Sequence, residues 1–361
     1  MAGKPKYEEI VDWIKNQIES GQLRDGEKLD SENNLVIKFE VSRQTVRHAL
    51  DELVNEGLLE KRRGSGTYVT IPVVKVNGPN TRRIAVMTTY VNDYIFVPII
   101  QSIEAVLSRS GYTMHLMFTG NSVEKERELL QAFLKNRDID GIIAEPTKSN
   151  LPSPNIELYK QIQESGIPIL QINSYYKELK APHVCIDDRQ AGEKATQYLI
   201  GQGHTKIAGI FKLDDGQGGR RYLGYLDALM ENNIKISENR IAWIDTVDLK
   251  GDLDNFSKIT KRIQDCSACL CYNDEVAVKL LELLRIMEIS VPSQMSVIGI
   301  DNSQLAKHCV PPLTSINNPT NEIGEKAAES IINLINGINT EMEIEINPDI
   351  IIRESVYMKR Y

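Results

Sequence analysis

The sequence predicts an α/β protein with two unlike parts, a small N-terminal domain in residues 1–70 and a larger domain with a doubly wound parallel sheet in residues 83–361. Two observations lead to this prediction. Apolar residues in the first part recur at three- and four-residue spacing, which is the helical period. In the second part, short apolar runs typical of buried strands alternate with amphipathic helical segments, the pattern of a parallel sheet with crossover helices.

The composition is that of a soluble globular protein. Of the 361 residues, 41% are hydrophobic and 25% are charged, which suffices for two or three domains. No run approaches the ~18 apolar residues of a membrane span, and the N-terminus has no apolar segment typical of a secretion signal. Five cysteines, an odd number, without such a signal indicate a reducing compartment. We therefore expect a cytoplasmic protein with no membrane partner.

Three helices are expected in the N-terminal domain. The first spans Tyr7–Ser20 and the second Ser31–Phe39, each with its apolar residues on one face. The third begins behind Ser42, whose hydroxyl suits an N-cap, and ends near Gly57, where a left-handed residue is favoured. The face of the third helix opposite its apolar stripe is basic and polar, with no acid in its first two turns.

Two short strand-like runs follow, Leu58–Glu60 and Thr67–Val69, joined by the basic, glycine-containing segment Lys61–Gly66. Three helices and a basic hairpin in this order predict a winged helix-turn-helix, whose third helix enters the major groove of DNA while the wing contacts the backbone or minor groove. For two arginines alone, a solvated cationic helix face is the simpler interpretation. That interpretation does not account for the capped helix, the Gly-x-Gly turn and the basic tip in succession.

The candidate DNA-binding residues lie at the start of the third helix, in the wing and before the first helix. Arg43 and Arg47 are four residues apart, so both project from one face and suit guanine or phosphate. Residues 1–70 hold 11 Lys/Arg and 13 Asp/Glu, so affinity must come from the local placement of charge, and binding should be selective and salt-sensitive. The set is Lys6, Ser42, Arg43, Gln44, Thr45, Arg47, Arg63, Ser65 and Gly66.

This domain resembles the DNA-binding domain of the GntR family. The resemblance rests on Val41–Leu50, VSRQTVRHAL, and on Gly64–Val69, GSGTYV. One departure is Asp30, where the family usually has a proline before the Ser-Glu pair. The resemblance implies that the domain binds double-stranded operator DNA. Residues 71–82, which contain two prolines and no helical period, are predicted to form a linker.

The larger domain is predicted to hold nine strands with helices between most of them. About 280 residues exceed a comfortable single core, so two doubly wound lobes with a cleft between them are expected. The carboxyl ends of the strands are where such sheets bind ligands. The strands are expected near Ile84–Thr88, Tyr112–Phe118, Gly141–Ala144, Pro168–Ile172, Val184–Ile186, Lys206–Phe211, Ile241–Ile244, Ala268–Tyr272 and Ser296–Ile300.

Motifs at these strand ends resemble the effector domain of the LacI/GalR family. They include Ile186–Gly192, Arg221–Tyr225, Val297–Asp301 and Pro311–Ile316. The resemblance implies a fold like that of periplasmic sugar-binding proteins, in which each lobe is built from separate chain segments. One lobe would hold roughly 82–174 plus a segment after Ser303, and the other roughly 175–302 plus the C-terminus. The alanine-rich hinge helix of that family does not follow the DNA-binding domain here.

A sugar site needs planar polar side chains that hydrogen-bond hydroxyls in pairs and aromatic faces against which C–H groups stack. Arg189, Asn273 and Asp301 match family positions that contact effector, while Arg221 matches one that contacts ligand or braces the lobes. Tyr90 and the next two aromatic residues would form an aromatic wall, unless their rings pack against the next helix. The candidate effector-binding residues are Tyr90, Glu145, Arg189, His204, Arg221, Asn273 and Asp301.

No cofactor, metal or catalytic site is expected. Cys266, Cys269 and Cys271 have no histidine nearby and are best interpreted as buried core thiols. The glycine-rich segments lack the spacing of a nucleotide-binding loop, and no catalytic motif occurs.

The predicted function is a homodimeric transcriptional repressor that binds operator DNA and is released by a small sugar. The pairing of a GntR-type with a LacI/GalR-type domain resembles the arabinose-responsive repressors of Gram-positive bacteria, and this resemblance implies L-arabinose as the effector. Two alternatives stay open. One is a different effector, such as another pentose or a purine, and the other is a sugar- or nucleotide-modifying enzyme with an accessory DNA-binding domain.

Overall fold

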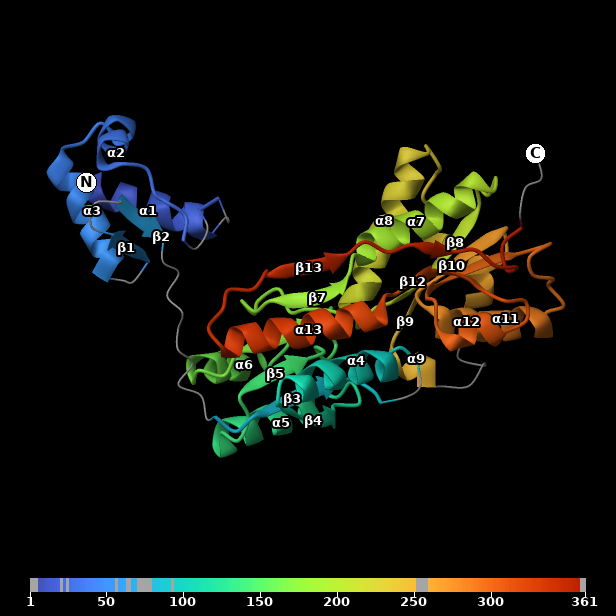
Figure 1. Ribbon diagram of the computed structural model, residues 1–361. Coiled ribbons are helices and arrows are strands. Elements are labelled where there is room, and N and C mark those ends of the chain that lie inside the picture. The colour runs from blue at the N-terminus through green and yellow to red at the C-terminus, as the bar shows by residue number, and fades with distance from the viewer. Residues whose placement is uncertain are drawn as a thin grey trace. The chain divides into compact units, whose positions relative to one another are not determined.

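The structure is a computed structural model that describes residues 6–19, 22–23, 26–55, 58–62, 66–69, 80–91, 94–250 and 259–357. The chain forms two compact units, Met1–Lys75 and Val76–Tyr361 (Figure 1). Within the described residues, no helix is long and apolar enough to span a bilayer.

The described residues of the N-terminal unit form three helices and an antiparallel hairpin, as predicted. Its elements are α1 (Lys6–Glu19), α2 (Glu32–Phe39), α3 (Arg43–Asn55), β1 (Leu59–Arg62) and β2 (Gly66–Val69). In the hairpin, Leu59 pairs with Val69 and Arg62 pairs with Gly66. The apolar faces of the helices meet in one core, whose fully buried side chains include Ile10, Ile14, Leu35, Val46, Leu50 and Leu53.

Serines cap both helices of the expected helix-turn-helix. The Ser31 hydroxyl accepts a hydrogen bond from the backbone N–H of Asn34 at 3.2 Å, and the Ser42 hydroxyl accepts one from the N–H of Thr45 at 3.1 Å. The absence of a proline at Asp30 therefore leaves α2 with a defined start, because the Ser31 cap supplies it. Gly57, the expected end of α3, lies outside the described residues.

The larger unit contains two six-stranded sheets, one in each lobe. The sheet of lobe 1 has the order β4-β3-β5-β6-β7-β13 and is parallel throughout. Helices α4 (Phe96–Arg109) and α13 (Thr320–Ile335) pack together on one face, and α5 (Val123–Asn136) and α6 (Ile156–Glu164) cover the other. The strands are β3 (Arg83–Thr88), β4 (Thr113–Phe118), β5 (Gly141–Ala144), β6 (Ile169–Ile172), β7 (His183–Ile186) and β13 (Glu343–Ile346).

The sheet of lobe 2 has the order β9-β8-β10-β11-β12-β14, and only its last pair, β12 with β14, is antiparallel. Its strands are β8 (Ile207–Lys212), β9 (Ile241–Ile244), β10 (Ala268–Cys271), β11 (Ser296–Asp301), β12 (Thr314–Asn317) and β14 (Ile350–Ile351). Its helices are α7 (Asp188–Gly201), α8 (Gly216–Glu231), the short 3-10 helix Glu238–Arg240, α9 (Thr246–Lys250), α11 (Asp274–Ile286) and α12 (Gln304–His308). Cys269 and Cys271 are buried in β10 as expected, whereas Cys266, also expected to be a buried core thiol, is partly exposed.

The chain crosses between the lobes after β7, after β12 and after β13, and this corrects the expected lobe boundaries at residues 174 and 303. Because β7 pairs with both β6 and β13, it completes the sheet of lobe 1. Because β12 pairs with β11, the segment after residue 303 stays in lobe 2 as far as residue 317. β12 is polar and β14 spans 2 residues, so neither has the apolar run on which the strand prediction relied.

Helices α7 and α8 approach closely because a glycine of each helix faces the backbone of the other. A Cβ added at Gly224 would lie 1.9 Å from the carbonyl oxygen of Arg189, and one added at Gly192 would lie 2.0 Å from that of Arg221. Both obstacles are backbone atoms, which cannot rotate away. The close approach lets Arg221 of α8 reach Asp188 of α7, and this pair lies directly behind the cavity described below.

Gly224→Ala is expected to lower the free energy of unfolding by about 1–3 kcal/mol, because α7 and α8 must move apart to admit the methyl group. Gly201→Ala is the matched control, since Gly201 ends α7 with nothing within 4 Å of an added Cβ. The control should leave stability unchanged or raise it by up to about 1 kcal/mol. Urea denaturation measures both variants, and equal stabilities would contradict the close approach.

Candidate functional site

The first candidate site is the exposed face at the start of α3. Both of its arginines are held by side chains of α2. Arg43 Nη2 donates to Asn33 Oδ1 at 2.6 Å, and Arg47 Nε donates to Glu32 Oε2 at 3.0 Å. The Arg47 side chain is 61% exposed, and exposed ion pairs contribute about 0–1 kcal/mol. A phosphate or a base edge can therefore replace these partners at small cost.

The polar residues beside the arginines divide into two kinds. Gln44 is exposed on the same turn and its side chain is available to a groove. The Ser42 hydroxyl accepts the N–H of Thr45 and lies 2.8 Å from the Thr45 hydroxyl, so both of these hydroxyls take part in starting the helix. Ser42 and Thr45 thus position the face even where they contact no nucleotide.

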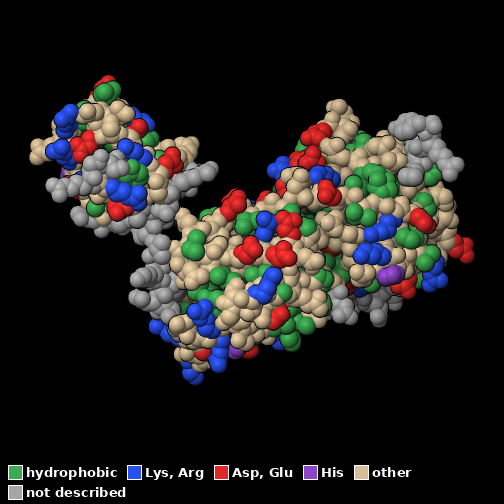
Figure 2. Space-filling model, in the orientation of Figure 1, with side chains coloured by type: hydrophobic (Ala, Val, Ile, Leu, Met, Phe, Trp, Pro, Cys, Tyr) green, Lys and Arg blue, Asp and Glu red, His purple; other side chains and the backbone are tan. Residues whose placement is uncertain are grey.

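The remaining predicted DNA-binding residues flank this face. Lys6 is exposed at the start of α1. Gly66 begins β2 with φ of 122°, a conformation that an L side chain rarely adopts, so the wing strand needs glycine here. Arg63 and Ser65 lie outside the described residues. Figure 2 shows the Lys and Arg side chains of this unit interspersed with acids.

Sequence reasoning missed His48, which lies on the same hollow of the surface as Gln44 and Arg47. The ring of His48 contacts Tyr7 of α1 edge-on, with ring centroids 4.5 Å apart. The sequence could have indicated His48, because it follows Gln44 by one helical turn and so belongs to the same exposed face.

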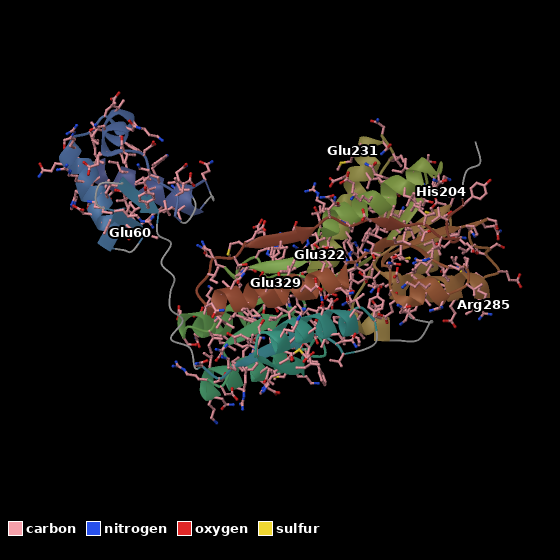
Figure 3. The ribbon with its side chains drawn as sticks, in the orientation of Figure 1. Glu60, His204, Glu231, Arg285, Glu322 and Glu329 are labelled. Atoms are coloured by element: carbon pink, nitrogen blue, oxygen red, sulfur yellow. The ribbon has the colours of Figure 1, made fainter. Side chains whose placement is uncertain are left out.

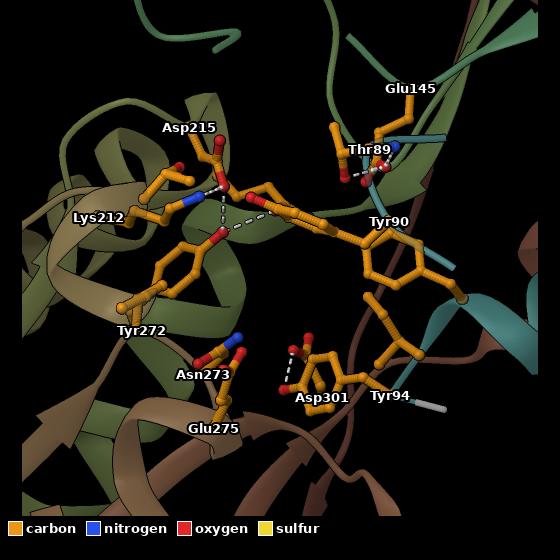
Figure 4. Close-up of a pocket in the computed structure, with 15 residues that line it drawn as sticks. Thr89, Tyr90, Tyr94, Glu145, Lys212, Asp215, Tyr272, Asn273, Glu275 and Asp301 are labelled. Carbon is orange, nitrogen blue, oxygen red and sulfur yellow. Dashed lines mark hydrogen bonds and ion pairs between the residues drawn. The ribbon is translucent and has the colours of Figure 1, made fainter. Parts of the chain in front are cut away.

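The second candidate site is a cavity of about 210 Å³ between the two lobes, at the carboxyl ends of their strands (Figure 4). Pockets that bury drug-sized ligands span about 300–1,000 Å³, so this one suits a smaller molecule. Lobe 1 contributes Thr89, Tyr90, Tyr94, Ile95, Phe96 and Glu145, and lobe 2 contributes Lys212, Asp215, Gln217, Thr246, Leu249, Tyr272, Asn273, Glu275 and Asp301.

The lobe 1 wall is organised around the buried carboxylate of Glu145, which follows β5. Its Oε2 accepts hydrogen bonds from the backbone N–H and the hydroxyl of Thr89, at 2.7 and 2.5 Å. Its Oε1 accepts one from Asn173 Nδ2 at 3.0 Å. Burial raises the pKa of Glu145, although these hydrogen bonds act in the opposite direction. Tyr90 contacts Phe96 edge-on at 6.1 Å, and both rings line the cavity as part of a small apolar cluster.

The lobe 2 wall carries a buried ammonium group at the end of β8. Lys212 is 3% exposed, and its Nζ lies 2.6 Å from Asp215 and 3.5 Å from Asp214. Burial acts to lower the pKa of Lys212, but the two carboxylates outweigh it and the pKa is raised. The Tyr272 hydroxyl lies 3.0 Å from both Asp215 Oδ2 and Gln217 Oε1.

The floor of the cavity is Asp301, at the end of β11, with Arg221 behind it. Arg221 is 1% exposed. Its guanidinium donates to Asp188 Oδ1 at 2.8 Å, to the Tyr272 carbonyl at 2.6 Å and to Asp301 Oδ1 at 3.4 Å. Burial acts to lower the pKa of Arg221, but Asp188 and Asp301 outweigh it, so the side chain stays charged. Arg221 therefore braces the floor from behind.

A tyrosine of lobe 1 reaches across the cavity to this floor. The Tyr94 hydroxyl donates to Asp301 Oδ2 at 2.5 Å and accepts the backbone N–H of Asp274 at 3.2 Å. A further hydrogen bond between the lobes joins Asn121 Nδ2 to the Thr246 hydroxyl at 2.7 Å. The two lobes are therefore in direct contact around the cavity.

Two predicted effector residues, Arg189 and His204, lie away from the cavity, and this corrects the sequence analysis. Arg189 pairs with Asp227 through two hydrogen bonds of 2.6 and 3.0 Å, and its side chain is 57% exposed. His204 follows α7 (Figure 3). Its Nδ1 lies 2.8 Å from the Ser267 hydroxyl. Arg189 lies away from the cavity because of its position on the turn of α7. The side chain that turns inward is that of the preceding residue, Asp188.

The other predicted residues are brought together. Tyr90, Glu145, Asn273 and Asp301 line the cavity, and Arg221 contacts Asp301 from behind. Sequence reasoning missed Lys212 and the residues that surround it. A charged residue ending the apolar run IAGIFK was the available signal, because a strand that is buried along its length brings its last side chain into a ligand crevice.

A winged-helix unit joined to a two-lobed domain with a polar cavity between its lobes is the architecture of a transcription regulator. Residues 6–69 match the family model of bacterial regulatory proteins of the gntR family, and residues 196–356 match that of a periplasmic binding protein-like domain. Among solved structures, a transcriptional regulator CelR–cellobiose complex superposes with a TM-score of 0.67 at 24% identity, covering 87% of this chain and 91% of that one. The transcription regulator CcpA of Lactococcus lactis gives 0.68 at 25% identity, covering 76% and 99%.

Two proteins named arabinose metabolism transcriptional repressor are similar over nearly the whole length. That of Halalkalibacterium halodurans is 37% identical, covering 97% of this chain and 96% of the relative. That of Geobacillus stearothermophilus is 36% identical, covering 97% of each. The chain belongs to this family of transcriptional repressors of sugar metabolism. It is a DNA-binding regulator and not an enzyme.

Asp274 supplies a pH-dependent test of the cavity floor. It is buried and accepts hydrogen bonds from the Ser315 hydroxyl at 2.6 Å and the Ser303 N–H at 2.7 Å. Burial and the charge of Asp301 raise the pKa of Asp274 from 3.8 to about 7. Because the folded state holds this proton more tightly than the unfolded chain does, the proton contributes stability that is full below the unfolded pKa and is lost as the pH rises through the folded pKa.

Asp274→Asn should therefore flatten the decline in the free energy of unfolding between pH 3.8 and about pH 7. The asparagine keeps the shape of the side chain and a carbonyl oxygen for Ser303. Urea denaturation across this range, with wild type alongside, measures the two slopes. The same slope in both proteins would contradict the raised pKa.

Proposed function

We propose that the cavity binds L-arabinose, or a pentose of the same shape, and that the bound sugar lowers the affinity of the N-terminal unit for operator DNA. The printed names of the two similar repressors support the choice of sugar. The observation that carries the proposal is one small cavity in which each lobe presents a buried carboxylate, Glu145 from lobe 1 and Asp301 from lobe 2.

The polar groups of the cavity suit the hydroxyls of a neutral sugar. Carboxylate oxygens of Glu145 and Asp301 accept hydrogen bonds, and the amide of Asn273 both donates and accepts. Each sugar hydroxyl that is buried without a partner costs about 1–3 kcal/mol, so the placement of these groups selects among stereoisomers. The rings of Tyr90 and Phe96 supply apolar surface for the C–H groups of the sugar.

The charge of the cavity argues against a phosphorylated ligand. Its lining holds four carboxyl groups and one ammonium group: Glu145, Asp215, Glu275, Asp301 and Lys212. The ammonium group already pairs with Asp215 at 2.6 Å. An anion would meet like charges at short range, which destabilises binding in a partly desolvated site. A neutral polyol meets hydrogen-bond partners.

On the DNA side, we propose that residues 1–70 bind one operator half-site and that residues 83–361 bind the effector and form a homodimer. A helix-turn-helix unit of this size covers one half-site, and a second copy raises the effective concentration without new contacts. Residues 71–82 would link the two functions, although residues 70–79 lie outside the described residues.

Arg43→Ala and Arg47→Ala are each expected to weaken operator binding by about 1–3 kcal/mol if they contact bases. Arg285→Ala is the control, because it removes an exposed cation from α11 of lobe 2 and should leave operator affinity unchanged. Gel-shift titration measures the affinities, and the thermal shift caused by the sugar should stay as in wild type. Normal operator binding by both α3 variants would contradict the assignment of this helix.

Asp301→Asn is expected to weaken L-arabinose binding by about 1–3 kcal/mol, because a carboxylate acceptor becomes a neutral amide. The variant should stay on the operator at sugar concentrations that release wild type, since the sugar acts only through its differential affinity for the two states. Arg189→Ala is the control, because its side chain is exposed outside the cavity. Calorimetry measures the affinity for the sugar, and gel shift measures release from the operator.

Circular dichroism of Asp301→Asn confirms that the variant is folded before its affinity is interpreted. Release of this variant by sugar as readily as wild type would contradict the cavity as the effector site. Binding of a different pentose or of a purine in place of L-arabinose would leave the cavity assignment intact and correct the ligand.

A further inference from the structure

A second cluster of reactive side chains lies outside the effector cavity, at the edge of the lobe 1 sheet where β7 and β13 pair (Figure 1). His183 and Cys185 are two residues apart on β7, so their side chains leave the same face of the sheet. Glu345 of β13 is the register partner of Cys185. One ligand atom from each of these three residues lies within 4.8 Å of the other two.

The imidazole of this cluster is buried with a free nitrogen. His183 is 4% exposed, and its Nε2 has no hydrogen-bond partner in the structure. That nitrogen lies 3.7 Å from Glu345 Oε1. The ring is fixed in place by Tyr175, which stacks on it with ring centroids 3.9 Å apart. A buried polar atom without a partner costs about 1–3 kcal/mol, so a ligand that fills this gap gains by it.

A cation lies beside this cluster. The Arg220 guanidinium stacks over the Tyr175 ring, with its Cζ 4.4 Å from the ring centroid. The Arg220 guanidinium lies 3.2 Å from Asp188, whose carboxylate offsets its charge.

We propose that His183, Cys185 and Glu345 form a binding site for a divalent transition-metal ion, with Zn²⁺ as the preferred ion. Imidazole, thiolate and carboxylate are together the ligand types of zinc, and three protein ligands leave a fourth position for water. Ligand atoms at tetrahedral angles around zinc are roughly 3.5 Å apart, so side-chain shifts of about 1 Å complete the site. The Glu345 side chain is 35% exposed and gives the ion a path from solvent.

The proposed metal site lies next to two of the chain crossings between the lobes. Among the described strands, β13 pairs with β7 alone. Each of these two strands leads directly into a crossing between the lobes, and the backbone N–H of Asp187 in one crossing donates to the carbonyl of Ile346 at 2.9 Å. A metal ion held by both strands would tie two of the three crossings together and stabilise the hinge between the lobes.

The test uses the full-length protein, stripped of metal with a chelator under reducing conditions. Zn²⁺ is titrated in competition with a chromogenic chelator, bound zinc is counted by atomic emission after dialysis, and thermal unfolding is followed with and without the ion. One equivalent of zinc and a raised Tm are expected. Glu345→Gln and Cys185→Ser should each weaken binding by at least about tenfold, because each removes one ligand.

Cys266→Ser is the matched control, since Cys266 is a partly exposed thiol in the other lobe, lobe 2, and its replacement should leave zinc binding unchanged. Co²⁺ provides a second readout, because a thiolate-to-cobalt charge-transfer band should appear in wild type and in Cys266→Ser and be absent from Cys185→Ser. If Cys185→Ser is unstable, the exposed Glu345→Gln still decides the matter. No retained zinc, or equal affinity in wild type and both ligand variants, would overturn the proposal.

Discussion

The effector domain depends on one buried guanidinium, that of Arg221. Taking a charge out of water costs several kcal/mol unless its partners are well placed. Here Asp188 of α7, the Tyr272 carbonyl after β10 and Asp301 at the end of β11 supply those partners. A single side chain of α8 thereby joins three elements of lobe 2 and fixes the carboxylate that forms the cavity floor. Removing one partner of such a group typically costs about 3–5 kcal/mol, so complete loss of a partner at the floor would also lower the stability of the lobe.

At the proposed effector site, the same interaction would couple contact between the lobes to ligand binding. Tyr94 of lobe 1 donates to Asp301 Oδ2, while Arg221 donates to Asp301 Oδ1. A sugar in the proposed site would offer hydroxyls to the same carboxylate and to Glu145 in the opposite lobe. It would therefore exchange a direct contact between the lobes for contacts through itself. The difference in free energy between these two arrangements sets how far the equilibrium can move.

Much of the fold and of the candidate site could be predicted from the sequence, and the errors of prediction have physical causes. Helical period, caps and turn residues are local, so the three helices and the wing of the N-terminal unit fall within a few residues of expectation. Lobe membership is decided by strand pairing between distant segments, which is why β7 and β12 were assigned to the other lobe. In the site, strand ends indicated Glu145, Asn273 and Asp301, whereas one step of helical phase separates the exposed Arg189 from the buried Asp188. The place of Lys212 at the end of a buried strand was a usable signal, whereas its pairing with Asp215 depends on the turn after that strand.

The pairing of Arg43 and Arg47 with side chains of α2 bears on how a repressor searches a genome. Competing non-specific sites number about 10⁶–10⁹, and a protein with bare cations spends its time bound to them. Glu32 and Asn33 occupy the two guanidinium groups until a better partner is presented. Each such exposed pair contributes about 0–1 kcal/mol, so random DNA, which offers phosphates but not the matching base edges, would gain slightly less than the operator from displacing these partners. If α3 reads the operator as proposed, Glu32 beside it would thus shorten unproductive encounters.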